Sequence, residues 1–254
     1  MFMLQSLGWA ALGTGFTFLM TALGAAMVFF LSEEPKPRFQ KAVLGFAAGV
    51  MTAASVWSLL LPAIEQAETG TYFPGWVPAA GGMLVGVAFL AVLDGVLPRL
   101  RKKETDPIHR QSALLMTAIT LHNIPEGMAV GLAFALAASG EAFAAAAALA
   151  LGIGIQNFPE GAAIALPLRQ EGRPRGRAFL GGMLSGSVEP VFGILVVLIA
   201  ASAQPVMPWL LSFAAGAMLY VVVEELIPQA HSRAGTCGFV VGFLMMMVLD
   251  VALG

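Results

Sequence analysis

Charged residues are scarce in this sequence, and that scarcity excludes an ordinary soluble domain. Only 11% of the 254 residues are charged and 58% are hydrophobic, whereas soluble domains contain about 25% charged and about 45–50% apolar residues. The mean hydropathy of +0.84 likewise shows that apolar residues dominate the chain. We therefore expect nearly the whole chain to lie in a lipid bilayer.

Cysteine is scarce, and two common functional motifs are missing. The single cysteine, Cys237, has no second cysteine with which to form an intrachain disulfide. The sequence contains neither the Gly-x-x-x-x-Gly-Lys-Ser/Thr loop that holds nucleotide phosphates nor the His-Glu-x-x-His pattern of zinc proteases. We expect no enzymatic activity, and an intramembrane metalloprotease is disfavoured. The net charge of −2 gives no reason to expect a nucleic-acid partner.

Long apolar segments are what the sequence has instead, and each is long enough to cross a bilayer, which needs about 20 apolar residues in a helix. They predict an all-α membrane protein in which residues 1–254 form a single domain of eight transmembrane helices. The expected helices are Leu4–Leu31, Lys41–Ile64, Trp76–Leu97, Ser112–Ala138, Ala142–Leu168, Ala178–Ser202, Val206–Pro228 and Gly235–Leu253.

The basic residues predict the orientation of these helices, because Lys and Arg collect in cytoplasmic loops. All of them fall between helices 1 and 2, 3 and 4, 5 and 6, or 7 and 8, and the alternate loops hold none. Both termini are therefore expected outside the cytoplasm, in a multi-pass protein of the cell (inner) membrane. The basic residues are Lys36, Arg38, Lys41, Arg99, Arg101, Lys102, Lys103, Arg110, Arg169, Arg173, Arg175, Arg177 and Arg233.

An internal repeat marks helices 4 and 5. Helix 4 contains His122-Asn-Ile-Pro-Glu-Gly127, and helix 5 contains Gln156-Asn-Phe-Pro-Glu-Gly161. Consecutive helices with a short connection run antiparallel, so the two copies enter the membrane from opposite sides, as in transporters with inverted repeats. Gly127 also begins a Gly-x-x-x-Gly pair, and such pairs at positions 45/49, 82/86, 127/131 and 182/186 predict close helix packing.

The repeated motif places ligand-type side chains together. His122 and Glu126 are four residues apart and share a helix face, as do Gln156 and Glu160, with Asn123 and Asn157 beside them. A carboxylate inside a bilayer costs about 2.5–3.5 kcal/mol unless it faces a partner or a cavity. Apart from Lys41 at the first position of helix 2, no Lys or Arg lies inside a predicted helix to compensate Glu126, Glu160 or Glu189 in helix 6.

Buried carboxylates, amides and one imidazole without a basic partner indicate a divalent cation site. Nitrogen and oxygen ligands without thiolate suit zinc, iron, manganese, cobalt or cadmium better than copper(I). Zn²⁺ or another divalent metal would then be the transported substrate, and the choice among these metals stays open.

At these residues the sequence resembles the ZIP (Zrt/Irt-like) family of divalent metal transporters, and the Gln156–Gly161 motif resembles its prokaryotic GufA-like branch. The resemblance implies a binuclear centre between helices 4 and 5, with a first site of His122, Glu126, Gln156 and Glu160. A second site would use Asn123, Asn157 and Glu189, with Glu126 and Glu160 bridging. Asn157 replaces an acidic residue of a bacterial relative, which implies a second site that is weaker or only tunes the first. The resemblance also implies a homodimer.

Four further residues are candidates for the metal pathway by the same resemblance: Met51, Glu224, Glu225 and His231. The two glutamates are equally compatible with interfacial charges that face Arg233, and Met51 with simple packing. The function predicted overall is a carrier that moves divalent metal, zinc first, into the cytoplasm. The alternative is a proton-coupled carrier of an organic solute, which would also use buried carboxylates.

Overall fold

A computed structural model describes residues 2–30, 36–70, 74–100, 107–139, 143–202 and 204–253, with some side chains inside these ranges left out. All regular elements in the described ranges are helical. In chain order they are α1 (Phe2–Ala26), η1 (Met27–Phe29), α2 (Pro37–Ala54), η2 (Ser55–Leu60), α3 (Leu61–Gly70), α4 (Trp76–Leu100), α5 (Pro107–Ser139), α6 (Phe143–Gln170), α7 (Arg175–Gly186), α8 (Val188–Ser202), η3 (Gln204–Val206), α9 (Met207–Val221), η4 (Val222–Leu226), α10 (Ile227–Ala230) and α11 (Arg233–Leu253).

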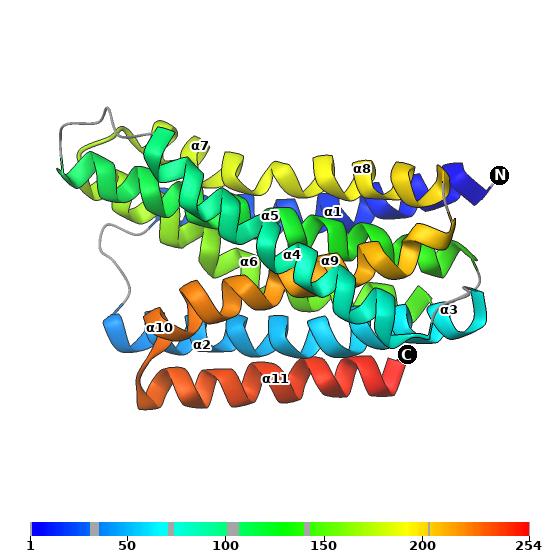
Figure 1. Ribbon diagram of the computed structural model, residues 1–254. Helices are drawn as coiled ribbons and strands as arrows, with labels where there is room; N and C mark the ends of the chain where they lie inside the picture. The colour runs from blue at the N-terminus through cyan, green and yellow to red at the C-terminus, as the bar shows by residue number, and fades with distance from the viewer. Residues whose placement is uncertain are drawn as a thin grey trace.

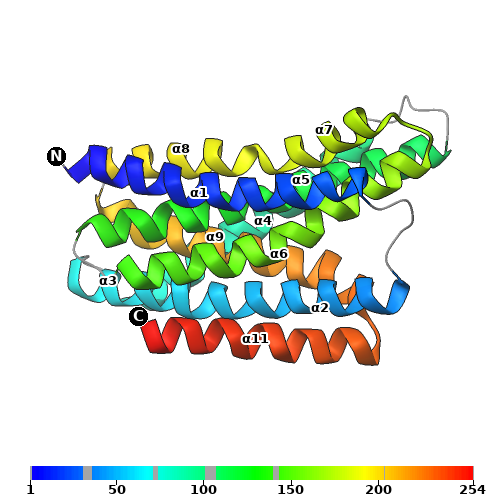
Figure 2. The same cartoon turned by 180° about the vertical axis from the view of Figure 1, so that it is seen from behind.

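Seven helical stretches of the described residues are long and apolar enough to cross a membrane, which confirms a multi-pass helical membrane protein. A shorter apolar stretch, Asn123–Ala138, lies in α5, and α5 as a whole has 33 residues. The start of α1 and the end of α11 lie at the same end of the molecule (Figures 1 and 2). The basic starts of α2, α7 and α11 lie at the opposite end (Figure 1).

Two spans contain π-helical segments that the sequence analysis did not anticipate. η2 (Ser55–Leu60) comes two residues before Pro62, and η4 (Val222–Leu226) comes two residues before Pro228. Proline has no N–H to give to the carbonyl four residues earlier, so the preceding turn widens instead of continuing as a regular α-helix. The widened turn before Pro228 carries Glu224 and Glu225.

The helices pack as two groups. The first bundle consists of α1, α5, α6, α7 and α8, and the second bundle consists of α2, α3, α4, α9, α10 and α11. Figure 1 shows α1 and α8 along one side of the molecule and α2 and α11 along the other, with α5 and α6 between them. α6 contacts α2 and α11, and α5 contacts α9, so the two helices that carry the repeated motifs also join the bundles.

Glycine allows the close approach of helices in both bundles, as the Gly-x-x-x-Gly pairs predict. A Cβ atom at Gly45 or Gly49 would overlap α11, and one at Gly82 or Gly86 would overlap α9. The pair 127/131 lies in the same way against α8, and the pair 182/186 lies against α6 and α1. Backbones in contact at these points fix the relative positions of the helices.

Candidate metal centre

The polar residues of the repeat lie in the interior of the first bundle. They are buried although their side chains are polar. Asn123 and Glu126 on α5, Gln156 and Asn157 on α6, and Glu189 on α8 are each fully buried, and Glu160 on α6 is 6% exposed. We call these six residues the polar centre. Its members come from three helices, and α1 and α7 supply hydroxyl and carbonyl groups around it.

The two copies of the motif contact each other through Glu126 and Gln156. The Gln156 side-chain amide donates a short hydrogen bond to Glu126 Oε1. Glu160 lies one turn beyond Gln156 on α6, and the charges of Glu126, Glu160 and Glu189 are near enough to one another to interact. Three acidic groups held this close in a buried place favour the binding of a cation between them.

Glu189 is held by groups from two other helices. The Nδ2 atom of Asn157 lies 3.0 Å from each carboxylate oxygen of Glu189, and the Thr21 hydroxyl donates to Oε1 over 3.4 Å. Neutral donors therefore orient this carboxylate without cancelling its charge. Nδ2 of Asn157 also lies 3.4 Å from the carbonyl oxygen of Thr17 on α1, which links α6 to α1 at the same point.

The local sequence explains why Glu189 reaches the centre. α7 ends at Gly186 and α8 begins at Val188, so the helix is interrupted at Ser187. The hydroxyl of Ser187 donates to the carbonyl of Leu184 over 2.6 Å. Glu189 thus lies in the first turn of α8, where the helix dipole favours a negative charge. Gly127 lets α5 approach the backbone of Glu189, since a Cβ atom there would overlap it.

Three amide oxygens at the centre are placed so that they could accept a donor or contact a cation. The side-chain oxygens of Asn123, Gln156 and Asn157 are buried and accept no hydrogen bond in the described part of the protein. Their amide nitrogens are occupied, with Asn123 Nδ2 donating to the carbonyl of Ser185 over 3.0 Å. Buried oxygens are rarely left without a donor, and amide and carboxylate oxygens are ligands of divalent cations.

The predicted ligand set is only partly tested by this arrangement. The backbone of His122 lies in α5 one turn before Glu126, and its side chain lies outside the described residues. Among the side chains that are described, no three His, Cys, Asp or Glu residues form a ready metal-binding group. The centre instead combines carboxylates with amides, so the assignment of its ligands to two metal sites stays a prediction.

Sequence analysis missed the hydroxyl groups that line the centre. Thr14, Thr17 and Thr21 of α1 are buried, and Thr21 bonds to Glu189. Their spacing of three and four residues places them on one helix face, and that signal was available in the sequence. A lone hydroxyl in an apolar helix usually bonds to its own backbone, as Thr14 does to the carbonyl of Ala10 over 2.7 Å.

The four pathway candidates all lie in or next to the second bundle. Met51 is fully buried in the apolar core. Glu224 is exposed and Glu225 is half-buried, and both lie in η4. His231 is exposed, and its carbonyl accepts a bond from Lys41 Nζ over 3.3 Å. None of these contacts tests a role in transport.

Fold and site together define a multi-pass membrane protein with a buried centre of carboxylates and amides. The chain belongs to the ZIP family: the family model described as ZIP Zinc transporter matches residues 101–250. The chain is 37% identical to "Zinc transporter ZIP11" of Homo sapiens, with 96% of this chain and 97% of the relative covered.

Two bacterial relatives support the prokaryotic GufA-like branch. "Zinc transporter GufA" of Myxococcus xanthus is 37% identical over 92% of this chain and 94% of its own length. "Zinc transporter ZIPB" of Bordetella bronchiseptica is 40% identical over 97% of this chain and 82% of its own length. The resemblance seen in the repeated motif is thereby confirmed at the level of family and branch.

Proposed function

We propose that this protein transports divalent metal ions, with zinc as the main substrate, through the polar centre of the first bundle. The observation that carries the proposal is the group of three buried amide oxygens that accept no hydrogen bond from the described residues and lie beside the carboxylates of Glu126 and Glu189. Membership of a family whose relatives are named zinc transporters supports the choice of zinc. Iron(II), manganese, cobalt and cadmium suit the same oxygen and nitrogen ligands.

The metal would bind between α5 and α6. His122, Glu126, Gln156 and Glu160 form the first site in this proposal, and Asn123, Asn157 and Glu189 form the second. The Asn157–Glu189 bonds support a second site that is already held together by protein groups. Metal ligands must lose their protons to bind, so acidification opposes binding and assists release.

The direction of transport is proposed from topology. Eight spans with both termini outside the cytoplasm place the basic helix ends inside, and the common position of the two chain ends in Figures 1 and 2 is compatible with an even number of spans. Metal would enter from outside an inner membrane and leave on the basic side. Glu224 and Glu225 on η4 are candidates for the exit, and a homodimer is compatible with the family.

The test is uptake of zinc into proteoliposomes that contain a metal-sensing dye, with iron(II), manganese and cadmium as competitors. The wild type is compared with the His122→Ala, Glu160→Ala double variant and with empty liposomes. Saturable uptake that the double variant loses supports the proposal and ranks the metals. Wild-type protein that is folded but gives no more uptake than empty liposomes contradicts it and favours the proton-coupled carrier of an organic solute.

A further inference from the structure

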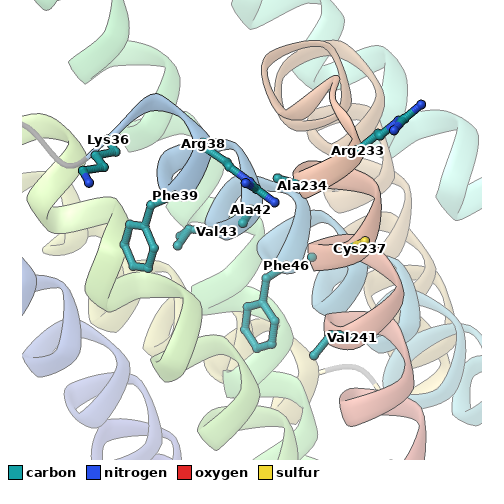
Figure 3. Close-up of a pocket in the computed structure, with 11 residues that line it drawn as sticks. Lys36, Arg38, Phe39, Ala42, Val43, Phe46, Arg233, Ala234, Cys237 and Val241 are labelled. Carbon is teal, nitrogen blue, oxygen red and sulfur yellow. The ribbon is translucent and has the colours of Figure 1, made fainter.

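A groove lies between α2 and α11 at the basic end of the molecule. Its residues are distant in sequence from those of the polar centre. It has a volume of about 710 Å³ and is lined by the first turns of both helices. Figure 3 shows Lys36, Arg38 and Arg233 at one end of the groove, with Phe46 and Val241 toward the other. The metal-transport proposal uses none of these residues.

The charged end of the groove is suited to an anion. Lys36, Arg38 and Arg233 are exposed, and none of the three forms an ion pair within the described residues. α2 begins at Pro37 and α11 at Arg233, so the positive ends of two helix dipoles lie beside the same cations. No side chain caps the start of α2. Pro37 has no N–H, and the N–H groups of Phe39 and Gln40 donate to the carbonyl of Lys36, so it is the helix dipole and the basic side chains that favour an anion here.

The rest of the groove is apolar and faces outward. Phe39 is 62% exposed and Val241 is 59% exposed, although both lie on spans that cross the membrane. Only 22% of the most apolar part of α11 is buried inside the protein, so most of this helix faces lipid. Gly45 and Gly49 hold α2 tightly against α11 below the groove, which keeps its walls in place.

We propose that this groove binds an anionic phospholipid of the leaflet on the basic side. The phosphate group would contact Arg38, Arg233 and Lys36, and one acyl chain would lie against Phe39, Phe46 and Val241. Arginine holds phosphate oxygens through paired N–H donors, and basic pockets between spans at the cytoplasmic side suit anionic head groups. A free phosphate ion would use the charged end but would gain nothing from the apolar wall.

The experiment is native mass spectrometry of the detergent-purified full chain with phosphatidylglycerol or phosphatidylcholine added in increasing amounts. The Arg38→Gln, Arg233→Gln variant is compared with the Arg175→Gln, Arg177→Gln variant, which removes the same charge from the same end but outside the groove. We expect the wild type and the second variant to retain phosphatidylglycerol in preference to phosphatidylcholine. The first variant should lose on the order of tenfold or more in that preference, since each basic residue near an anionic surface contributes about fivefold.

An equal loss in both variants overturns the proposal, because only net charge would then matter. Displacement of phosphatidylglycerol by inorganic phosphate alone overturns the lipid assignment. Dimers that bind no lipid at this position also overturn it, because a second copy of the chain would then cover the groove.

Cys237 lines the groove and is the chain's single cysteine, so it supplies a second readout. Its reaction with N-ethylmaleimide in nanodiscs should be slower with phosphatidylglycerol than with phosphatidylcholine, and equal rates contradict the proposal.

Discussion

The two bundles pack by the same means but differ in what they bury. Glycine contacts join α5 to α8 in the first bundle and α4 to α9 in the second. Buried polar residues, however, gather in the first bundle, which holds the polar centre and the threonines of α1. The second bundle buries Ser55, Ser212 and Asp250. Tight packing alone therefore gives no functional assignment, whereas the distribution of buried polar groups does.

Asp250 makes the comparison sharper, because it is a buried carboxylate of the second bundle. Its Oδ1 accepts a hydrogen bond of 2.6 Å from Ser58, which ties α11 to η2. Among the described residues it has no amide donor such as the one that Asn157 offers to Glu189. We interpret Asp250 as a structural group and the carboxylates of the polar centre as ligands, and the following substitutions test that distinction.

The largest effect is expected from Glu126→Gln combined with Glu160→Gln. Both changes keep the shape of the side chain and remove charge from the centre, so zinc uptake into proteoliposomes should fall by more than about 100-fold, beyond the loss typical of residues that only support ligands. Asp250→Asn is the matched control and should leave uptake within about twofold of wild type. Equal losses in the two proteins would remove the difference between the bundles.

The next effect concerns packing. Gly127→Ala would overlap the backbone of Glu189, and Gly86→Ala would overlap the backbone of Phe213. Each should lower the free energy of unfolding by about 1–3 kcal/mol, as overpacking does, measured by thermal unfolding in detergent. Only Gly127→Ala should also weaken zinc binding, because it displaces Glu189. Gly8→Ala, with open space at its Cβ, is the control for both.

An effect of comparable size is expected at Asn157. Asn157→Ala removes the donor that faces both oxygens of Glu189, and hydrogen bonds to charged groups contribute about 1.5–3 kcal/mol. Asn157→Asp supplies an extra acidic ligand instead. Zinc bound per chain, measured by mass spectrometry of the metal after dialysis, should rise in Asn157→Asp and fall in Asn157→Ala. The same stoichiometry in both variants would contradict a second metal site here.

The smallest effects compare two hydroxyl groups that bond to buried carboxylates. Thr21→Val breaks the 3.4 Å bond to Glu189, and Ser58→Ala breaks the 2.6 Å bond to Asp250. Each should lower the free energy of unfolding, measured by thermal unfolding, by about 1.5 kcal/mol, the lower end for a hydrogen bond to a charged group, because one bond is lost where Asn157→Ala loses two. Calorimetric titration should show weaker zinc binding for Thr21→Val alone. Weaker binding for Ser58→Ala instead would assign a metal-related role to the second bundle.

Much of the fold could be predicted from the sequence because apolar length and glycine spacing act locally. The segment 76–97 corresponds to α4, and the predicted pair Gly45/Gly49 does pack against another helix. The π-helical turns before Pro62 and Pro228 could not be placed in this way, since proline can kink, widen or end a helix according to its neighbours. The break at Ser187 likewise depends on the packing of α8.

The polar centre was predictable in its residues and not in its connections. Their position in apolar segments into which the sequence puts hardly any Lys or Arg singled out Glu126, Glu160 and Glu189. Which side chain faces which depends on helix rotation, so the pairs Gln156–Glu126 and Asn157–Glu189 had to come from the structure. Thr21 belongs to a helix 168 residues away from Glu189 in the chain, and no local pattern connects the two.

The most direct test of a metal centre in the first bundle is X-ray absorption at the zinc edge, recorded on purified protein loaded with one equivalent of zinc. We predict a shell of oxygen and nitrogen ligands at about 2.0–2.2 Å without sulfur, absent from Glu126→Gln, Glu160→Gln protein and unchanged in Asp250→Asn protein. A sulfur shell at about 2.3 Å, or a spectrum that the double substitution leaves unchanged, would contradict the proposed centre.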